Sequence, residues 1–133
     1  SSQRAANFHP DLVILGFGMN DRCGMEEYRN KTGRLMEAIR KVSPKTEFLL
    51  IASTLPNELA ATEPHHFWAH QDEYSESLKG LEGMGVAIAD IQAVQKEIGK
   101  RKRYIDITGN WLNHPNDYLA RILAQVVIKT LGM

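Results

Sequence analysis

The sequence predicts a three-layer α/β fold in which helices cover both faces of a parallel sheet, and one alternating pattern carries that prediction. Short, purely apolar runs alternate along the chain with longer stretches in which apolar residues recur at three- and four-residue steps. The short runs are typical of buried parallel strands, and the longer stretches are typical of amphipathic helices. Successive parallel strands must be joined by crossovers, and here the helical stretches supply them.

Three apolar runs are expected to form the strands, at residues 12–15, 48–52 and 86–91. Turn-forming residues close the first two runs, with Gly16-Phe17-Gly18 after the first and Pro56 after the second. The first run is apolar without alternation, which is typical of a strand with a neighbour on each side. Three strands are few for this class of sheet. We therefore expect the fold to lack strands that would lie beside the first run.

Four stretches have helical periodicity, at about 26–42, 67–81, 92–100 and 115–131. The last is the clearest, because Pro115 suits a first-turn position and Asp117 favours the positive end of the helix dipole. Neither an internal repeat nor a linker interrupts the pattern, so the 133 residues are expected to form a single domain. The inward face of the last helix should consist of Leu119, Ile122, Leu123, Val126, Val127 and Thr130.

Charge and composition narrow the classes of partner. Sixteen Lys and Arg balance sixteen Asp and Glu, so no large single-sign field is available for nucleic acid or for an anionic membrane. The basic run 100–103 follows a predicted helix, whose C-terminus favours cations, and no aromatic stacking surface accompanies it. No apolar run approaches the roughly 20 residues that cross a bilayer. Cys23 is the only cysteine, which excludes an internal disulfide and leaves the compartment open.

The loop after the first strand holds the first candidate site. Ligands of open parallel sheets bind beyond the carboxyl ends of the strands, and this position is occupied by Gly18-Met19-Asn20-Asp21. Gly18 allows close approach of the backbone, and the Asn20 side-chain amide is a donor suited to a developing oxyanion. Asp21 is suited to capping or orienting the following turn. Plain turns use the same residues, so this block alone leaves both interpretations open.

The second candidate site is the histidine of Asn113-His114-Pro115-Asn116-Asp117, which stands in a loop immediately before the last helix. A histidine held in a loop at such a position is suited to act as a general base. Taken alone, it is more simply interpreted as a residue at the start of a helix. The order of the two candidate blocks along the chain is more informative than either block alone.

Together and in this order, the two blocks resemble the SGNH (GDSL-type) hydrolase family. The resemblance runs from His9-Pro10-Asp11-Leu12-Val13 through the Asn20 block to the helix after His114, which is the later half of the family's domain. It implies a flavodoxin-like three-layer sheet and serine-esterase chemistry on a small acyl ester or an acetylated carbohydrate, with no metal or organic cofactor. It also implies that Asn20 is an oxyanion-hole donor, in a loop with Gly18 and Asp21, and that His114 is the base.

The family's Gly-Asp-Ser block, with its nucleophilic serine, is absent from this sequence, and so is the next block with its oxyanion glycine. Ser1 and Ser2 stand only a few residues before the first strand, whereas the family places its serine a full βαβ excursion earlier. They are poor candidates for the nucleophile. We expect both absent blocks to lie upstream of this chain.

The residue that orients the histidine is also open. The family often has an aspartate three residues before the histidine, and Trp111 stands at that place here. Asp106 or a backbone carbonyl would be an alternative partner for the imidazole. Asn110 or Asn113 would instead form hydrogen bonds within the loop, and the sequence does not choose among these arrangements.

Two other groups of residues suggest different chemistry, and in each case a plainer interpretation is favoured. His66 and His70 are spaced to share a helix face, but Asp72 and Glu73 alone have suitable ligand spacing, so an exposed cluster at a helix start is the simpler interpretation. Ser53 ends the second strand beside the expected pocket, but nothing in the sequence marks it as activated.

The absent serine block supports a rival hypothesis, in which this chain is catalytically incomplete and acts as a binding module. An uncovered first strand would expose unpaired backbone groups and apolar side chains that pair with another strand. We therefore expect association, either between copies of the chain or with a separate N-terminal segment.

Overall fold

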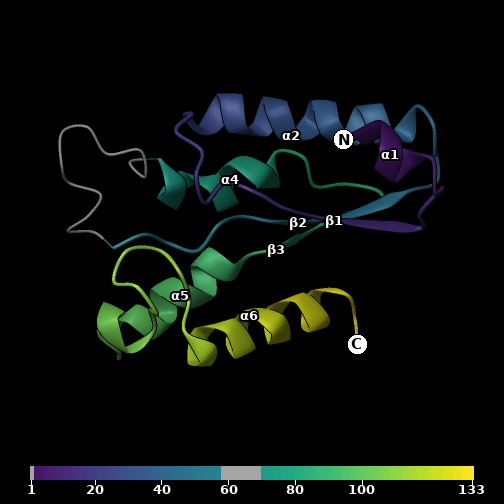
Figure 1. The fold of residues 1–133 in the computed structure, drawn as a ribbon. Helices are drawn as coiled ribbons and strands as arrows, with labels where there is room; N and C mark the ends of the chain where they lie inside the picture. Colours follow the sequence, from purple (N-terminus) through teal and green to yellow (C-terminus); the bar gives the residue numbers. More distant parts are fainter. Residues whose placement is uncertain (1, 58–69) are drawn as a thin grey trace.

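A parallel sheet forms the centre of the molecule in the computed structural model, which describes residues 2–57 and 70–133 (Figure 1). Within those residues the sheet has three strands, β1 (Leu12–Gly16), β2 (Glu47–Ile51) and β3 (Val86–Ala89), in the spatial order β1-β2-β3. Ile14 of β1 is in register with Leu49 of β2, which in turn is in register with Ala87 of β3. All three predicted strands are therefore present and parallel.

Helices cover both faces of this sheet, as Figure 1 shows. The helices α2 (Met25–Arg40) and α4 (Tyr74–Lys79) lie on one face, and α5 (Ile91–Gly99) and α6 (Asp117–Thr130) lie on the other. The predicted three-layer α/β/α arrangement is therefore confirmed. Three short helical elements complete the described chain: α1 (Ser2–Ala6), η1 (Gln71–Glu73) and η2 (Tyr104–Asp106).

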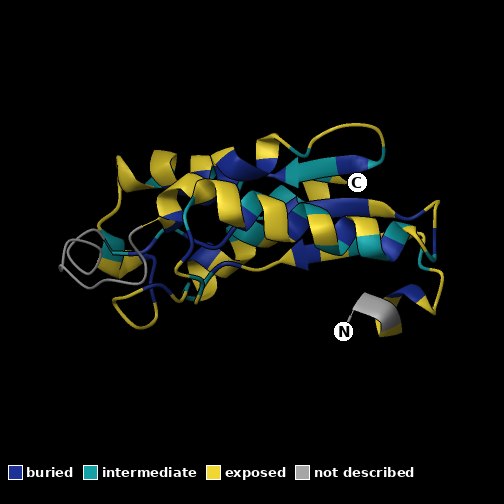
Figure 2. Cartoon of the chain, turned by 90° about the horizontal axis from the view of Figure 1, so that it is seen from above, coloured by how far each residue is buried: buried dark blue, intermediate teal, exposed yellow. Residues whose placement is uncertain are grey.

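The main core lies between the sheet and the layer of α2 and α4. Leu15, Phe48 and Leu50 belong to this core and cluster with Ile39 of α2 and Tyr74 of α4. Phe48 and Leu50 are 1% and 0% exposed. Full burial of such side chains stabilises a fold by about 1.5–3 kcal/mol each. In Figure 2 the buried positions follow the strands, whereas the outward faces of the helices are exposed. This core fixes the strand ends from which the loops emerge.

The last helix begins two residues later than predicted, at Asp117. Its N-cap is Asn116, whose Oδ1 accepts the backbone N–H of Leu119 at 3.1 Å. The prediction that Pro115 occupies the first turn is wrong, because Pro115 forms a β-bridge with Thr108 ahead of the helix. Asparagine is favoured at the N-cap because its side chain accepts a hydrogen bond from a free N–H of the first turn.

Two other boundaries also differ from prediction. The third strand ends at Ala89, because Asp90 caps α5 by accepting the N–H of Ala93 on Oδ1 at 3.0 Å. The helical stretch expected at 67–81 is divided into η1 and α4 in its described part and ends at Lys79. Residues 67–69 of that stretch lie outside the described residues.

One edge and one face of β1 are exposed. Leu12 and Ile14 are 39% and 50% exposed, although both belong to the apolar run that indicated a strand with two neighbours. Within 2–57 and 70–133, β1 pairs with β2 alone, and α6 lies against β3 instead. β1 is thus the uncovered strand that the sequence led us to expect. No helix in the same ranges is long and apolar enough to cross a membrane.

Candidate functional site

The two candidate loops lie at the same end of the molecule. Because the strands are parallel, their carboxyl ends share one edge of the sheet, which lies on the left in Figure 1. Asn20 is in the loop that leaves β1 at this edge, and His114 is in the loop that leads into α6 at the same edge. This is the edge at which open parallel sheets bind their ligands.

A buried glutamine holds the Asn20 loop. Gln71 has no exposed surface, and its Nε2 donates hydrogen bonds to the carbonyl oxygens of Gly18, at 2.8 Å, and of Met19. Asn20 is exposed, and its side chain forms no hydrogen bond with any residue in the described ranges. The backbone before Asn20 is therefore fixed while its amide is open to a ligand.

Two stacked tyrosines bracket the same loop. The rings of Tyr28 and Tyr74 lie 3.9 Å apart between centroids, with an interplanar angle of 10°. Tyr28 Oη donates to the carbonyl of Phe17 at 2.9 Å, and Tyr74 Oη donates to that of Cys23 at 2.7 Å. Burial raises the pKa of both phenols above the ordinary value, so both keep the proton that they donate.

Position 18 requires a glycine, both because of its backbone conformation and because there is no space for a side chain. Its φ is +116°, which side chains rarely adopt, and a Cβ there would lie 2.9 Å from Cδ2 of Tyr74. The N–H of Asp21 donates to the Gly18 carbonyl at 3.2 Å and closes the turn that presents Asn20. The Asp21 side chain does not cap α2, because the N-cap of that helix is Gly24.

Asn110 shapes the loop that carries His114. Its Oδ1 accepts three backbone N–H groups, those of Leu112, Asn113 and His114, each at 3.0 Å. The carbonyl of His114 accepts a hydrogen bond from Thr108 Oγ1 at 2.8 Å. The residue is exposed, and within the part of the chain that the structure describes its ring forms no hydrogen bond. The loop thus fixes the backbone of His114 and leaves the imidazole open.

The structure narrows the alternatives for a residue that orients this imidazole. The Asp106 carboxylate is engaged by Arg103, with Oδ1 3.1 Å from Nη2 and Oδ2 3.2 Å from Nε. Asn110 and Asn113 bond to each other within the loop, at 3.4 Å between Nδ2 and Oδ1. None of these three side chains contacts the ring of His114 by a hydrogen bond. Trp111, three residues before His114, lies exposed.

A second buried glutamine connects the Asn20 loop to the end of β2. Gln92, at the start of α5, is 1% exposed. Its Nε2 donates to the carbonyl of Gln71 at 2.6 Å and to the carbonyl of Ser53 at 2.9 Å. The residue that holds the Asn20 loop is therefore itself tied to the segment after β2. Neither glutamine belongs to a motif that the sequence marks as a candidate site.

The segment after β2 is tied in turn to the His114 loop. Thr54 Oγ1 donates to the carbonyl of Asn113 at 2.7 Å. The hydroxyl of Tyr104 lies 2.9 Å from the carbonyl oxygens of both Leu55 and Leu112, and burial raises the pKa of this phenol to about 12. Hydrogen bonds thus run from one candidate loop to the other through buried side chains.

The side chains of two remaining candidates, Ser53 and His70, do not take part in this series, to which Ser53 contributes only its carbonyl. Ser53 is 7% exposed, and no hydrogen bond joins it to His114 in the described ranges. His70 pairs with Glu73 at 3.5 Å, whereas His66 lies outside the described residues. Among the residues that are described, no three side chains are grouped to hold a metal ion.

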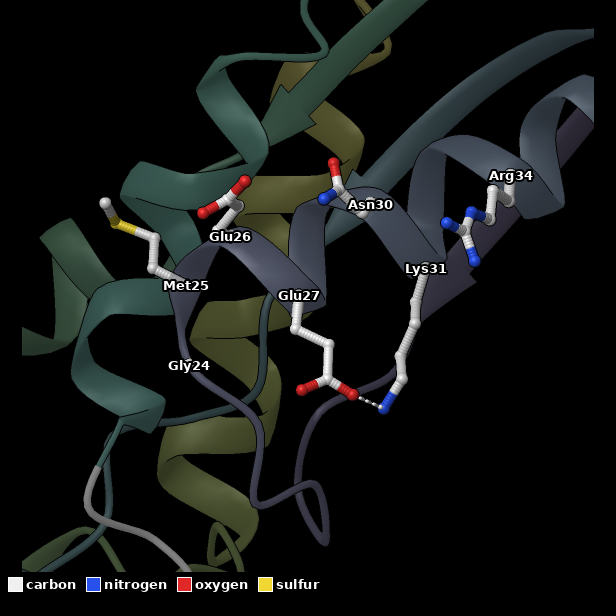
Figure 3. A pocket seen from close by; sticks show the side chains of 7 residues that line it. All are labelled: Gly24, Met25, Glu26, Glu27, Asn30, Lys31 and Arg34. Carbon is white, nitrogen blue, oxygen red and sulfur yellow. Dashed lines mark ion pairs between the residues drawn. The ribbon is translucent and has the colours of Figure 1, made fainter.

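A hollow along the outer side of α2, shown in Figure 3, begins at Gly24, where the loop that carries Asn20 ends. Glu27 and Lys31 form an ion pair across it at 2.7 Å. It contains none of the side chains predicted to act in catalysis. The residues that line it are Gly24, Met25, Glu26, Glu27, Asn30, Lys31 and Arg34.

Replacing Gln71 by methionine is expected to destabilise the protein by about 1–3 kcal/mol, because the carbonyl of Met19 loses the Gln71 donor and the buried carbonyl of Gly18 keeps only the N–H of Asp21. Unfolding in urea, followed by far-UV circular dichroism, measures this loss. Gln125 lies exposed on α6, so Gln125→Met is the matched control and should stay within about 0.5 kcal/mol of the unmodified protein. Equal stabilities of the two variants would show that Gln71 does not hold the loop.

Solved structures share this fold, although no family model and no curated protein matches the sequence. A protein described as a GDSL-like lipase from Parabacteroides merdae superposes with a TM-score of 0.78 and 20% identity. A carbohydrate esterase family 3 protein from Talaromyces cellulolyticus gives 0.70 and 15%, and LAE5, an α/β hydrolase from the metagenome of Lake Arreo, gives 0.72 and 17%.

The match covers almost the whole of this chain but only part of each neighbour. It spans 96%, 98% and 98% of the chain, in the same order, and 63%, 61% and 66% of the neighbours. The chain therefore has the fold of SGNH (GDSL-type) hydrolases and spans less than two thirds of the length of these structures.

Proposed function

We propose that this chain provides the general base and an oxyanion-hole amide of a serine ester hydrolase. The observation that carries the proposal is the series of buried hydrogen bonds that ties the Asn20 loop to the His114 loop at the carboxyl edge of the sheet. The fixed backbones of both loops support the preorganisation that acyl transfer requires, and the side chains of Asn20 and His114 are open to a ligand. The substrate class is a small acyl ester, including acetyl esters of carbohydrates, and the fold shared with a carbohydrate esterase supports this choice.

The reaction follows from the chemistry of the two side chains. A serine hydroxyl attacks the ester carbonyl carbon while the ring of His114 accepts its proton. The carbonyl oxygen becomes an oxyanion and accepts a hydrogen bond from Nδ2 of Asn20. The bond to the alcohol then breaks, and His114 returns the proton to the leaving oxygen. Water repeats the sequence on the acyl-serine, which releases the acid and restores the serine.

The attacking serine is proposed to lie outside the described residues. Ser53 is buried at the end of β2 and forms no hydrogen bond with His114 in the described part of the chain. A nucleophile and its base stand within hydrogen-bond reach of each other in a working enzyme. We place this serine beside the unpaired edge of β1, the strand from which the Asn20 loop emerges.

Labelling with a fluorophosphonate tests this function, because the reagent reacts with an activated serine whatever the natural ester is. The purified protein, with any segment that co-purifies with it, is labelled, and peptide mapping identifies the modified serine. We expect one modified serine and loss of the label in the His114→Asn variant. A protein that takes up no label, or that labels equally well in this variant, would refute the proposal.

A second candidate function, association through β1, is favoured by the exposed apolar surface of that strand. Leu12 and Ile14 lie on the strand itself, and Phe17, directly after it, is 58% exposed. Apolar side chains beside an unpaired strand edge are a common cause of association, because backbone groups and side chains both gain partners.

Light scattering on the isolated chain at micromolar concentration is expected to find a mass above that of one copy. Ile14→Lys should restore the monomer, because a charge on an edge strand opposes pairing. Ile128 on α6 is 48% exposed, so Ile128→Lys is the matched control and should still associate. A monodisperse monomer before any substitution would exclude this second function.

A further inference from the structure

A buried glutamine of α5 binds backbone groups from three segments of the chain. Nε2 of Gln92 donates to the carbonyl oxygens of Gln71, at 2.6 Å, and of Ser53, at 2.9 Å. Its Oε1 accepts the N–H of Ser75, in the first turn of α4, at 3.1 Å. Because α4 and α5 lie on opposite faces of the sheet (Figure 1), this one amide joins the two helical layers. Both of its N–H groups and its oxygen are engaged, so it holds the three segments in a fixed arrangement.

Through Gln71, the Gln92 amide acts on the Asn20 loop. The side chain of Gln71 donates to the carbonyl oxygens of the two residues directly before Asn20. Its Oε1 is buried and accepts no hydrogen bond from the part of the chain that the structure describes, so Nε2 alone bonds the Gln71 amide to its surroundings. The place of Nε2 depends in turn on the Gln71 backbone, whose carbonyl Gln92 binds. The position of α5 therefore helps to determine where the Asn20 loop is held.

The loop of the candidate base is attached to the same helix through a different residue. Gln95, one turn after Gln92, accepts the N–H of Leu55 on Oε1 at 2.8 Å and donates through Nε2 to the Leu55 carbonyl at 3.2 Å. Oη of Tyr104 lies 2.9 Å from this carbonyl oxygen and 2.9 Å from a carbonyl oxygen in the loop that carries His114. This connection from α5 to the base loop does not include Gln92.

We infer that Gln92 is a positioning residue, which fixes the Asn20 amide relative to His114. The inference rests on the proposed function, because it concerns the two side chains of that site. Removal of the Gln92 amide releases the carbonyl of Gln71 and with it the support of the Asn20 loop. The base loop keeps its attachment through Gln95. The oxyanion donor then moves relative to the base, and a displacement of about 1 Å in a site of this kind costs roughly 10²-fold in rate.

The rate of fluorophosphonate labelling tests this role, because the phosphonyl oxygen takes the place of the oxyanion and no natural substrate is needed. The purified protein, with any segment that co-purifies with it, is used. Gln92→Met is expected to label about 10–10²-fold more slowly. In the Asn20→Ala background the same replacement should change the rate by less than about threefold, since the donor that it positions is already gone. Lys96 is exposed on α5, so Lys96→Met is the matched control and should label at the unmodified rate.

Gln92→Glu is a second variant, which keeps the shape of the side chain and tests the role even if the methionine variant does not fold. Burial beside two carbonyl oxygens raises the pKa of the introduced carboxyl, which keeps one donor while it is protonated. Its labelling rate, divided by that of the unmodified protein at the same pH, is therefore expected to fall as the pH rises and the carboxyl ionises. In the Asn20→Ala background this ratio should not depend on pH.

Gln95→Met separates positioning of the Asn20 amide from a general loss of stability. Because Gln95 acts on the base loop, its effect on the labelling rate should be the same with and without Asn20→Ala. The positioning role is refuted if Gln92→Met leaves the rate unchanged, or if it lowers the rate equally in both backgrounds while the unmodified protein labels normally. A protein that takes up no label, or that labels normally after Asn20→Ala, would refute the proposed function itself, and this inference with it.

Discussion

Replacing His114 by asparagine is expected to lower kcat for p-nitrophenyl acetate by roughly 10²–10⁴-fold in the full protein, the contribution of a positioned general base. The imidazole is the group that takes the serine proton and returns it to the leaving alcohol. Its backbone is fixed by Asn110 and Thr108, through bonds to the N–H and the carbonyl of His114. Asparagine keeps those backbone bonds, so the loss should fall on the chemical step. Steady-state hydrolysis at several ester concentrations measures it.

His9 provides a matched control for this substitution. It is exposed, has a φ of 47° and lies ahead of β1, at the opposite edge of the sheet from the candidate loops. His9→Asn should leave kcat unchanged, since asparagine tolerates the left-handed backbone. A His114→Asn protein that turns over as fast as the His9→Asn protein would show that His114 is not the base.

Replacing Asn20 by alanine is expected to lower kcat by about 10²–10³-fold with little change in KM, as for the loss of one oxyanion-hole donor. The amide is needed where negative charge develops in the transition state, and the ground-state carbonyl needs it less. The loop itself should keep its shape, because Gln71 and the stacked tyrosines bond to its backbone and not to the Asn20 side chain. Kinetics on the same ester give both constants.

Asn30→Ala is the control for this variant, because Asn30 lies exposed on α2 and outside both candidate loops. Its kcat and KM should equal those of the unmodified protein. A rise in KM with an unchanged kcat in Asn20→Ala would mean that the amide binds the substrate without stabilising the transition state. That result would contradict the oxyanion role.

The sequence contained enough information to predict the layers of the fold. Continuous apolar runs are typical of strands in a parallel sheet, and the runs that begin at Leu12, Phe48 and Val86 are found in β1, β2 and β3. Parallel strands place their carboxyl ends at one edge, so the order of the elements sufficed to bring the Asn20 and His114 loops to the same end. The start of α6 was predicted less accurately, because Asn116 caps the helix and Pro115 lies ahead of it.

The hydrogen bonds that connect the two loops were not predictable in the same way. Gln71 and the carbonyl of Gly18 lie 53 residues apart in the sequence, and the Gln92 and Ser53 that continue the connection lie 39 residues apart. A buried amide adds no periodic apolar signal, so nothing local distinguishes it from a glutamine on the surface. Such residues are identified only when the fold shows which backbone groups would otherwise lack a partner.

A crystal structure of the fluorophosphonate adduct of the full protein tests most directly whether Asn20 and His114 serve one site. The phosphonyl group mimics the tetrahedral intermediate, so its oxygen marks the position of the oxyanion. We expect that oxygen to lie within about 2.7–3.1 Å of Nδ2 of Asn20, and the modified serine oxygen to lie within about 2.6–3.2 Å of a ring nitrogen of His114. An adduct in which either side chain lies beyond hydrogen-bond reach would contradict the shared site.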